Sequence, residues 1–206
     1  MTPAREATAA PDAPRRARRT APRADARANI DKILDATVRC LARDPNASVS
    51  EIAREAGVGR VTLYGHFASR EILVETALAR VIDEGDDVLS GLDLTGDPRR
   101  ALRTLIESSW LLMARAGAVL EAAQAVLPPS RIQDLHAKPA ARLEHLVRRG
   151  QAEGAFRTDL PADWLVSALH HLMKGAASDV ASGRLDRDQA PHFIADTMLA
   201  AVSPNR

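Results

Sequence analysis

The chain has 206 residues, of which 46% are apolar and only 3% aromatic, so a core must be built mainly from aliphatic side chains. The net charge of +1 does not point to a nucleic-acid partner at the level of the whole chain, and the single cysteine excludes an internal disulfide and a cysteine-based zinc site. No apolar run approaches the roughly 20 residues of a membrane span and no secretory signal is present, so we expect a cytoplasmic protein without a membrane partner.

The first segment, residues 1–26, is predicted to be a disordered basic tail. It consists mostly of alanine, proline, arginine and threonine and carries six arginines against three acidic residues. Such a composition cannot bury enough apolar surface to offset the entropy lost on ordering. Two interpretations stay open: a solvated leader, or an arm that adds phosphate contacts or enters a minor groove.

Three short helices are predicted after this tail. Apolar residues at helical spacing indicate a first helix over residues 28–42. Ser48 and Glu51 fit the capping box of a second helix over residues 50–56. A third helix, over residues 60–67, follows almost at once.

The remaining sequence also predicts helices only. Ser69 is expected to cap a fourth helix that runs to about Val88, and Asp97-Pro98 marks another helix start. Later helices are expected over 98–116, 118–126, a stretch capped by Ser130, 140–153 after an interruption at Pro139, 161–182 and 188–202. With no strand pattern, the fold class is all-α: a three-helix helix-turn-helix domain over 27–71, then a helical effector-binding and dimerisation domain over 72–206.

Residues 50–67 have the spacing of a helix-turn-helix. Two short helices that cross closely need a small residue at the crossing, which Ala53 supplies, and a tight turn, which Gly57 supplies four residues later. Leu63 and Phe67 are expected to bury the inner face of the second helix. This arrangement holds a short helix clear of the surface so that it fits the major groove of DNA.

The candidate DNA contacts lie mainly on that second helix. Hydroxyls and cations suit phosphates, a methyl group suits thymine, and glycine allows close approach of backbone. The candidates are Ser50, Arg60, Val61, Thr62, Tyr64, Gly65, His66 and Arg70.

The run from Thr62 to Phe67, followed by Ser69-Arg70-Glu71, resembles the signature of the TetR/AcrR family of bacterial regulators, and the match extends over residues 28–80. The resemblance implies a homodimer with about nine helices per subunit, in which the last two helices of each subunit form the interface. It also implies that Arg70, where the family usually has lysine, contacts phosphate. Gly59 departs from the family, which usually has a serine or threonine cap there, and Gly65 replaces a larger contact residue.

The C-terminal part is expected to hold an effector pocket of mostly apolar residues with few polar anchors. The candidate lining residues, chosen from a set that also includes His170 and Met173, are Trp110, Met113, His145, Trp164 and His171. Each has an alternative interpretation as an ordinary core or surface residue. No metal site is expected, because His170 and His171 are adjacent on a helix and point to different faces, so they cannot bind one metal ion together. No cofactor is expected either.

We therefore expect a ligand-responsive transcriptional regulator that is not an enzyme. It would be a repressor that a small-molecule effector releases from a palindromic operator in double-stranded DNA. One alternative is a helical interaction or carrier protein whose helix-turn-helix no longer binds DNA. A less favoured alternative is an enzyme, because no nucleophile elbow, phosphate-binding glycine loop or metal-spaced acid pair is present.

Overall fold

A computed structural model describes residues 21–205, and the part of the predicted tail before Ala21 lies outside these residues. Within them the chain forms α1 (Ala21–Arg43), α2 (Val49–Ala56), α3 (Arg60–His66), α4 (Arg70–Ser90), α5 (Pro98–Gln124), α6 (Pro129–Leu135), α7 (Ala137–Ala152), α8 (Ala162–Ala181) and α9 (Ala190–Ala201). No strand occurs in this part of the chain, so the all-α prediction is confirmed.

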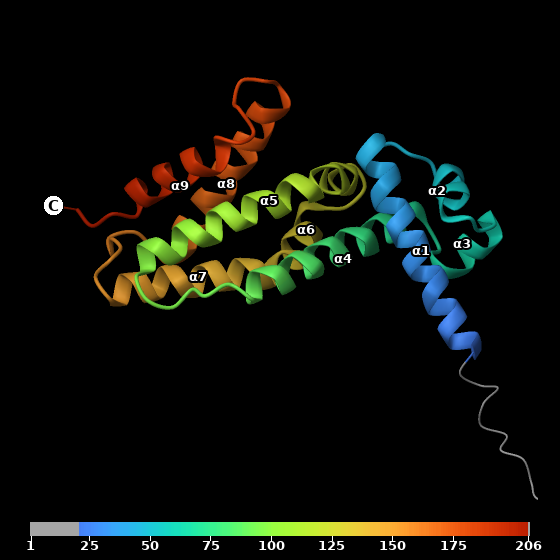
Figure 1. Ribbon diagram of the computed structural model, residues 1–206, viewed down its shortest axis with the longest axis horizontal. Coiled ribbons are helices and arrows are strands. Elements are labelled where there is room, and N and C mark those ends of the chain that lie inside the picture. Colours follow the sequence, from blue (N-terminus) through green and yellow to red (C-terminus); the bar gives the residue numbers. More distant parts are fainter. Residues whose placement is uncertain (1–20, 206) are drawn as a thin grey trace, which may run out of the picture.

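The helices form an elongated molecule with α1, α2 and α3 at one end (Figure 1). Helices α4, α5 and α7 run along the length of the molecule and pack against one another, and α8 and α9 complete the C-terminal bundle (Figure 1). None of the described helices is both long enough and apolar enough to cross a membrane.

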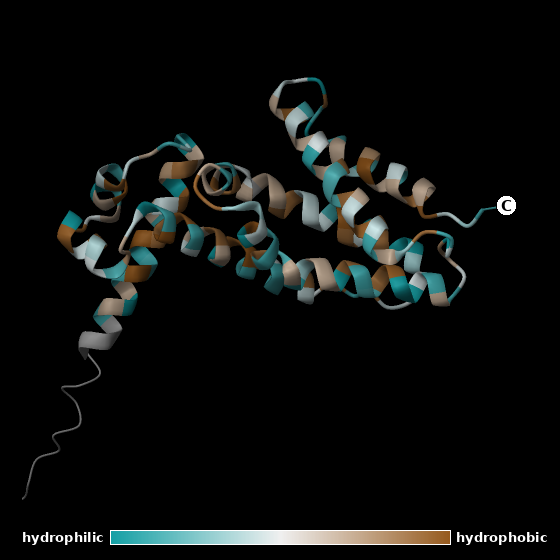
Figure 2. Ribbon diagram, turned by 180° about the vertical axis from the view of Figure 1, so that it is seen from behind, coloured by the Kyte–Doolittle hydropathy of each residue, from teal (hydrophilic) through white to brown (hydrophobic). Residues whose placement is uncertain are grey.

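Two hydrophobic cores hold this arrangement together, and hydrophobic residues recur between hydrophilic ones along the helices (Figure 2). The first core joins α1 to α4 around buried Leu41, Ile52 and Leu63. The second core joins the C-terminal helices around buried Ile106 and Phe156. The last turns of α5 contribute to the first core, whereas its earlier turns belong to the second core. Helix α5 therefore connects the two cores.

Helix α1 begins at Ala21, so the last six residues of the segment that we expected to be disordered are helical. Pro22 occupies the first turn of α1, where the missing amide hydrogen would have no partner within the helix. The composition of the segment predicted disorder, but a proline in the first turn is compatible with a helix.

Helix α5 is continuous, whereas the sequence predicted two helices separated at Gly117. An isolated glycine costs a helix only about 1 kcal/mol relative to alanine. Gly117 does not adopt a positive φ angle, and residues beyond it, such as Val119, are held in place by burial in the first core. Packing therefore outweighs the local propensity for a break.

The start of α7 was also mispredicted. Pro139 does not interrupt the helix, because it is the third residue of α7 and so lies in the first turn. Ser130 is not a cap: it lies inside α6, which begins at Pro129. The predicted turn after α7 is present, with Gly154 at a φ angle of 72°.

Candidate DNA interface and effector cavity

The helix-turn-helix is built by local hydrogen bonds. The amide of Glu51 donates to Ser48 Oγ at 3.3 Å, and the amide of Ser48 donates to Glu51 Oε2 at 2.7 Å, so the predicted capping box is formed. These bonds lower the pKa of the Glu51 carboxyl, with the Ser48 amide as the main cause. Gly57 ends α2 at a φ angle of 68°, and its amide donates to the Arg54 carbonyl at 3.1 Å.

This turn presents one face of α3 to solvent. Leu63 and Phe67 are buried on the inner side, with exposed fractions of 1% and 4%. On the outer side Val61 is 88% exposed and Tyr64 is 43% exposed. The outer side of α3 is therefore accessible to another molecule and presents both apolar and polar groups.

The candidate DNA contacts on α3 share this outer side. Arg60, Val61, Thr62, Tyr64 and Gly65 are exposed, and His66 is half-buried at the end of the helix. Ser50 is exposed on α2. Gly59 precedes α3 without a side-chain cap, and the surroundings of Gly65 are open.

Arg70 has a different environment. Its guanidinium Nη2 donates to the Pro45 carbonyl at 2.9 Å, in the loop between α1 and α2. The half-buried side chain therefore ties the first turn of α4 to that loop. The guanidinium of Arg70, which the family resemblance assigns to a phosphate contact, thus donates to the protein backbone.

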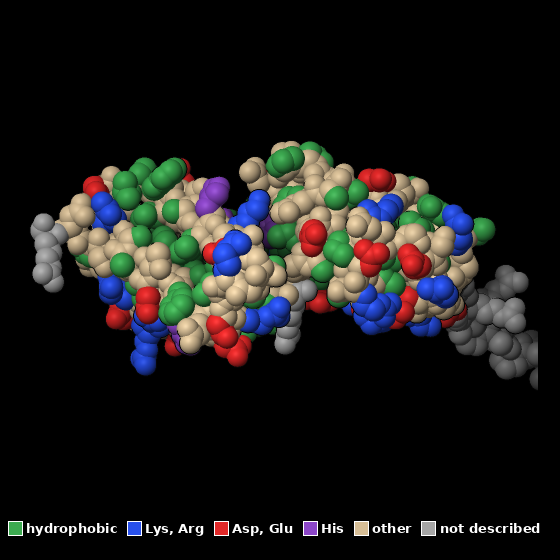
Figure 3. All heavy atoms as spheres, turned by 90° about the horizontal axis from the view of Figure 1, so that it is seen from above, with side chains coloured by type: hydrophobic (Ala, Val, Ile, Leu, Met, Phe, Trp, Pro, Cys, Tyr) green, Lys and Arg blue, Asp and Glu red, His purple; other side chains and the backbone are tan. Residues whose placement is uncertain are grey.

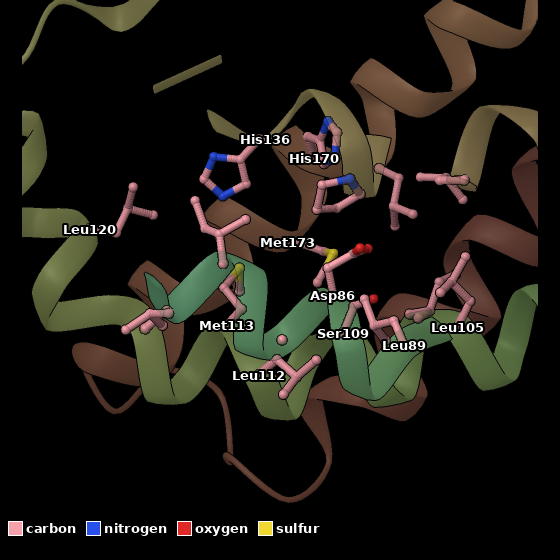
Figure 4. A pocket seen from close by; sticks show the side chains of 18 of the residues that line it. Asp86, Leu89, Leu105, Ser109, Leu112, Met113, Leu120, His136, His170 and Met173 are labelled. Carbon is pink, nitrogen blue, oxygen red and sulfur yellow. The ribbon is translucent and has the colours of Figure 1, made fainter. Parts of the chain in front are cut away.

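A cavity of about 190 Å³ lies in the C-terminal bundle, between α4, α5, α7 and α8 (Figure 4). Most of its lining is aliphatic or methionine side chains, among them Leu78, Leu105, Leu112, Met113 and Met173. A hollow in the surface with histidine side chains near it is visible in Figure 3. The mixture of an apolar wall and few polar groups is that of a small-molecule site.

The polar groups of the cavity are Asp86, Ser109, His136 and His170, and the two imidazoles lie along one side of it (Figure 4). Burial raises the pKa of the Asp86 carboxyl, but the close cationic groups of Lys138 and Arg142 lower it by more, so the group is ionised. Desolvation, together with the charges of His136 and His171, lowers the pKa of His170.

The predicted pocket residues occupy different places. Met113 lines the cavity, whereas Trp110 is 3% exposed and packs within the second core beside it. His145, Trp164 and His171 are exposed and do not belong to the lining. The five residues are thus not brought together at one site.

Sequence reasoning missed Asp86, which stands in the acidic run Asp83-Glu84-Gly85-Asp86-Asp87 and looks like part of a solvated face. A signal was nevertheless present. Asp86 lies at helical spacing between Ile82 and Leu89, so it falls on the apolar face of α4. A charged residue on such a face is a candidate functional group.

Helix α4 connects the cavity with the DNA-binding end. Leu78 belongs to the first core and also lines the cavity. Glu75 forms an ion pair with Arg131 of α6 at 2.6 Å, and Arg80 forms one with Asp35 of α1 at 2.6 Å. Helix α4 therefore contacts α1 and α6 as well as the cavity.

Together these features define an all-helical protein with a helix-turn-helix at one end and a cavity in its C-terminal bundle. Residues 33–77 match the family model of "Bacterial regulatory proteins, tetR family". This match agrees with the resemblance that the sequence shows to that family over residues 28–80.

Known relatives agree with this placement. The HTH-type transcriptional repressor LfrR of Mycolicibacterium smegmatis is 36% identical over 77 residues, a match that covers 37% of this chain and 41% of the repressor. The matched part is therefore less than half of that relative's length.

Solved structures extend the similarity along most of the chain. A structure from Saccharomonospora viridis, described as a transcriptional regulator in complex with choline, has a TM-score of 0.73 at 25% identity and covers 86% of this chain and 98% of that one. The TetR transcriptional regulator SCO0520 of Streptomyces coelicolor has a TM-score of 0.55 at 28% identity, with 86% and 99% coverage. These findings do not favour the carrier alternative.

Proposed function

We propose that the protein is a transcriptional regulator whose affinity for DNA is set by a small molecule in the cavity between α4, α5, α7 and α8. The observation that carries this proposal is the role of α4. Its first turn is tied to the helix-turn-helix loop through Arg70, and its later turns line the cavity through Leu78 and Asp86. One helix thus belongs to both sites.

The DNA site of the proposal is the outer face of α3. Val61 offers apolar surface to a thymine methyl group, and Arg60 offers a cation to a base edge or phosphate. Thr62, Tyr64 and His66 would contact phosphates or the groove wall, and Ser50 would do so from α2. Arg70 would reach phosphate only by giving up part of its bonding to the loop.

A homodimer would carry two recognition helices to successive major grooves of a palindromic operator, about 34 Å apart. The proposed dimer surface is formed by α8 and α9, where Trp164 is 61% exposed and Phe193 is 52% exposed. Hydrophobic side chains lie on the surface at this end of the molecule (Figure 3). Trp164→Glu should therefore shift the sedimentation of the protein towards the monomer, while an unchanged dimer would exclude Trp164 from the interface.

The effector would act by binding one position of α4 better than the other. The similarity to a regulator in complex with choline supports a small-molecule effector, and the similarity to the repressor LfrR supports repression that the effector relieves. The ion pairs of Glu75 with Arg131 and of Arg80 with Asp35 would then transmit the movement.

The test is a selection of binding sites from random double-stranded DNA by the full chain. The proposal predicts enrichment of a palindromic sequence, and Thr62→Ala and Tyr64→Ala should each weaken binding to that sequence about tenfold or more. Lys32→Ala, at an exposed position on α1 and away from α3, serves as the control and should change little. A folded protein that enriches no sequence would contradict the proposal.

A further inference from the structure

We propose that the cavity recognises a protonated aliphatic amine, and that the ammonium group pairs with Asp86 Oδ2 in place of Lys138. This inference deepens the proposed function by naming the chemical class of the effector. It rests on the polarity of the cavity wall, the bonding of one buried carboxylate and the absence of aromatic carbon rings from the described lining.

Asp86 presents the only carboxylate among the described residues that line the cavity. Its side chain is 1% exposed, yet it is ionised, because two cations approach it from outside the lining. Figure 4 shows the carboxylate extending from α4 into the cavity towards the side that carries His170. A buried carboxylate that faces a cavity is a strong site for a cation, since Coulomb attraction is little screened there.

The two carboxylate oxygens have unequal partners. Arg142 Nη1 donates to Oδ1 at 2.5 Å, and the Arg142 side chain is only 21% exposed, so this bond is well held. Lys138 Nζ lies 2.7 Å from Oδ2, but Oδ2 accepts no well-directed hydrogen bond from any described residue. Oδ2 is therefore the acceptor that a ligand can use.

Lys138 is also the partner that can leave at least cost. Its side chain is 71% exposed, so its ammonium would be fully hydrated once it moved away from Asp86. A ligand ammonium would take over its charge and add the directed hydrogen bond that Oδ2 lacks. After this exchange the ligand ammonium would be paired with Asp86, and the Lys138 ammonium would be surrounded by water. Neither positive charge would be buried without a partner.

A ligand carboxylate fits the same wall poorly. It would enter beside Asp86, with which it would share a like charge. His170 offers little compensation, because desolvation lowers its pKa and so disfavours its charged form. Asp86 is thus the only ionised group that the described lining presents to a ligand.

The body of the ligand follows from the remaining wall. The six tyrosine, tryptophan and phenylalanine residues of the chain are absent from the described lining, so no such ring can hold a quaternary ammonium by cation–π contact. A primary ammonium, which can donate to Oδ2, is favoured over a quaternary one. A cavity of 150 Å³ accommodates benzene, so one of about 190 Å³ suits roughly six to eight non-hydrogen atoms.

The test measures the binding of hexylamine to the full chain by isothermal titration calorimetry. Hexan-1-ol, hexanoate and propyltrimethylammonium are similar in size to hexylamine and serve as matched ligands that lack the charge, reverse it, or lack the hydrogen-bond donors. The inference predicts that hexylamine binds about tenfold or more tightly than each of the three, as expected for a charge-assisted hydrogen bond. Equal binding of hexylamine and hexan-1-ol would overturn it.

Two variants sharpen this result. Asp86→Asn should abolish the preference for hexylamine over hexan-1-ol while keeping the size of the side chain. Lys138→Ala removes the competing ammonium at an exposed position and should strengthen hexylamine binding severalfold, whereas Lys32→Ala on α1 should not. A Lys138→Ala variant that binds hexylamine more weakly than wild type would contradict the exchange, even if Asp86→Asn fails to fold.

A parallel measurement of DNA binding separates this inference from the proposed function. If the selected DNA binds and hexylamine does not, the amine assignment is wrong and the regulator remains. If hexylamine binds through Asp86 but no DNA is selected, the amine site stands and the regulatory role fails.

Discussion

Gly150 should not tolerate alanine, although it lies within the last turn of α7 and has no positive φ angle. A Cβ atom at this position would lie 2.1 Å from Cδ2 and 2.3 Å from Cε2 of Phe156. An ordinary carbon contact is about 3.5–4.0 Å, so the ring would have to move by more than about 1 Å. Phe156 is 1% exposed in the second core, so it has no free space into which to move.

Overpacking of this kind costs about 1–3 kcal/mol or more, and alanine's better helix propensity returns about 1 kcal/mol at most. We therefore expect Gly150→Ala to lower the unfolding free energy, with a fall of about 2–4 °C in Tm for each kcal/mol. Gly117→Ala is the matched control, because a Cβ there meets nothing within 4 Å and α5 is regular on both sides. That variant should be more stable than wild type by about 0.5–1 kcal/mol.

Thermal and urea unfolding followed by circular dichroism would measure both variants. Combining Gly150→Ala with Phe156→Leu should recover part of the loss, because the smaller side chain leaves room for the new methyl group. Opposite signs for the two glycine variants are the essential result. If Gly150→Ala were as stable as Gly117→Ala, the close approach of Phe156 to α7 would be wrong.

Three other substitutions test local bonding. Ser48→Ala removes the capping box and should lower the unfolding free energy by about 1 kcal/mol. Ser50→Ala on the same helix removes no cap and should lower the unfolding free energy less. Equal losses in the two variants would refute the capping role of Ser48. The hydrogen bond from Arg157 lowers the pKa of Asp159 to about 2 from its ordinary 3.8. Since the folded pKa is depressed, Asp159 stabilises the fold above pH 3.8 and loses this effect as the pH falls to about 2, so the urea midpoint of Asp159→Asn should depend less on pH in this window. Arg70→Lys keeps the charge but not the reach to the α1–α2 loop, and should cost about 1 kcal/mol in the same unfolding assay; full stability would argue against the loop contact.

The DNA-binding end was the most predictable part of the fold from sequence, because its signals are local. The capping box joins Ser48 with a residue three positions later, and Gly57 marks a turn that requires a positive φ angle. Such features involve residues that meet through the geometry of a single helix end. The same holds for Asp97-Pro98 at the start of α5.

The errors have a common physical origin. Gly117 and Pro139 are poor helix formers, but each stands where its cost is small: one in a helix held by tertiary packing, the other in a first turn. The cavity needs still longer-range information. The spacing of Asp86 within α4 places it on the apolar face, but it does not reveal Lys138 and Arg142, which α7 brings to it.

The central claim is that the outer face of α3 binds DNA as part of a regulator. The most direct measurement is fluorescence anisotropy of the full chain with the DNA upstream of its own gene, at two salt concentrations, for wild type and Tyr64→Ala. Tight wild-type binding that weakens with salt and is lost in the variant is the predicted result, because released counterions make phosphate contacts salt-dependent. Equal affinities of wild type and variant at both salt concentrations would contradict the claim.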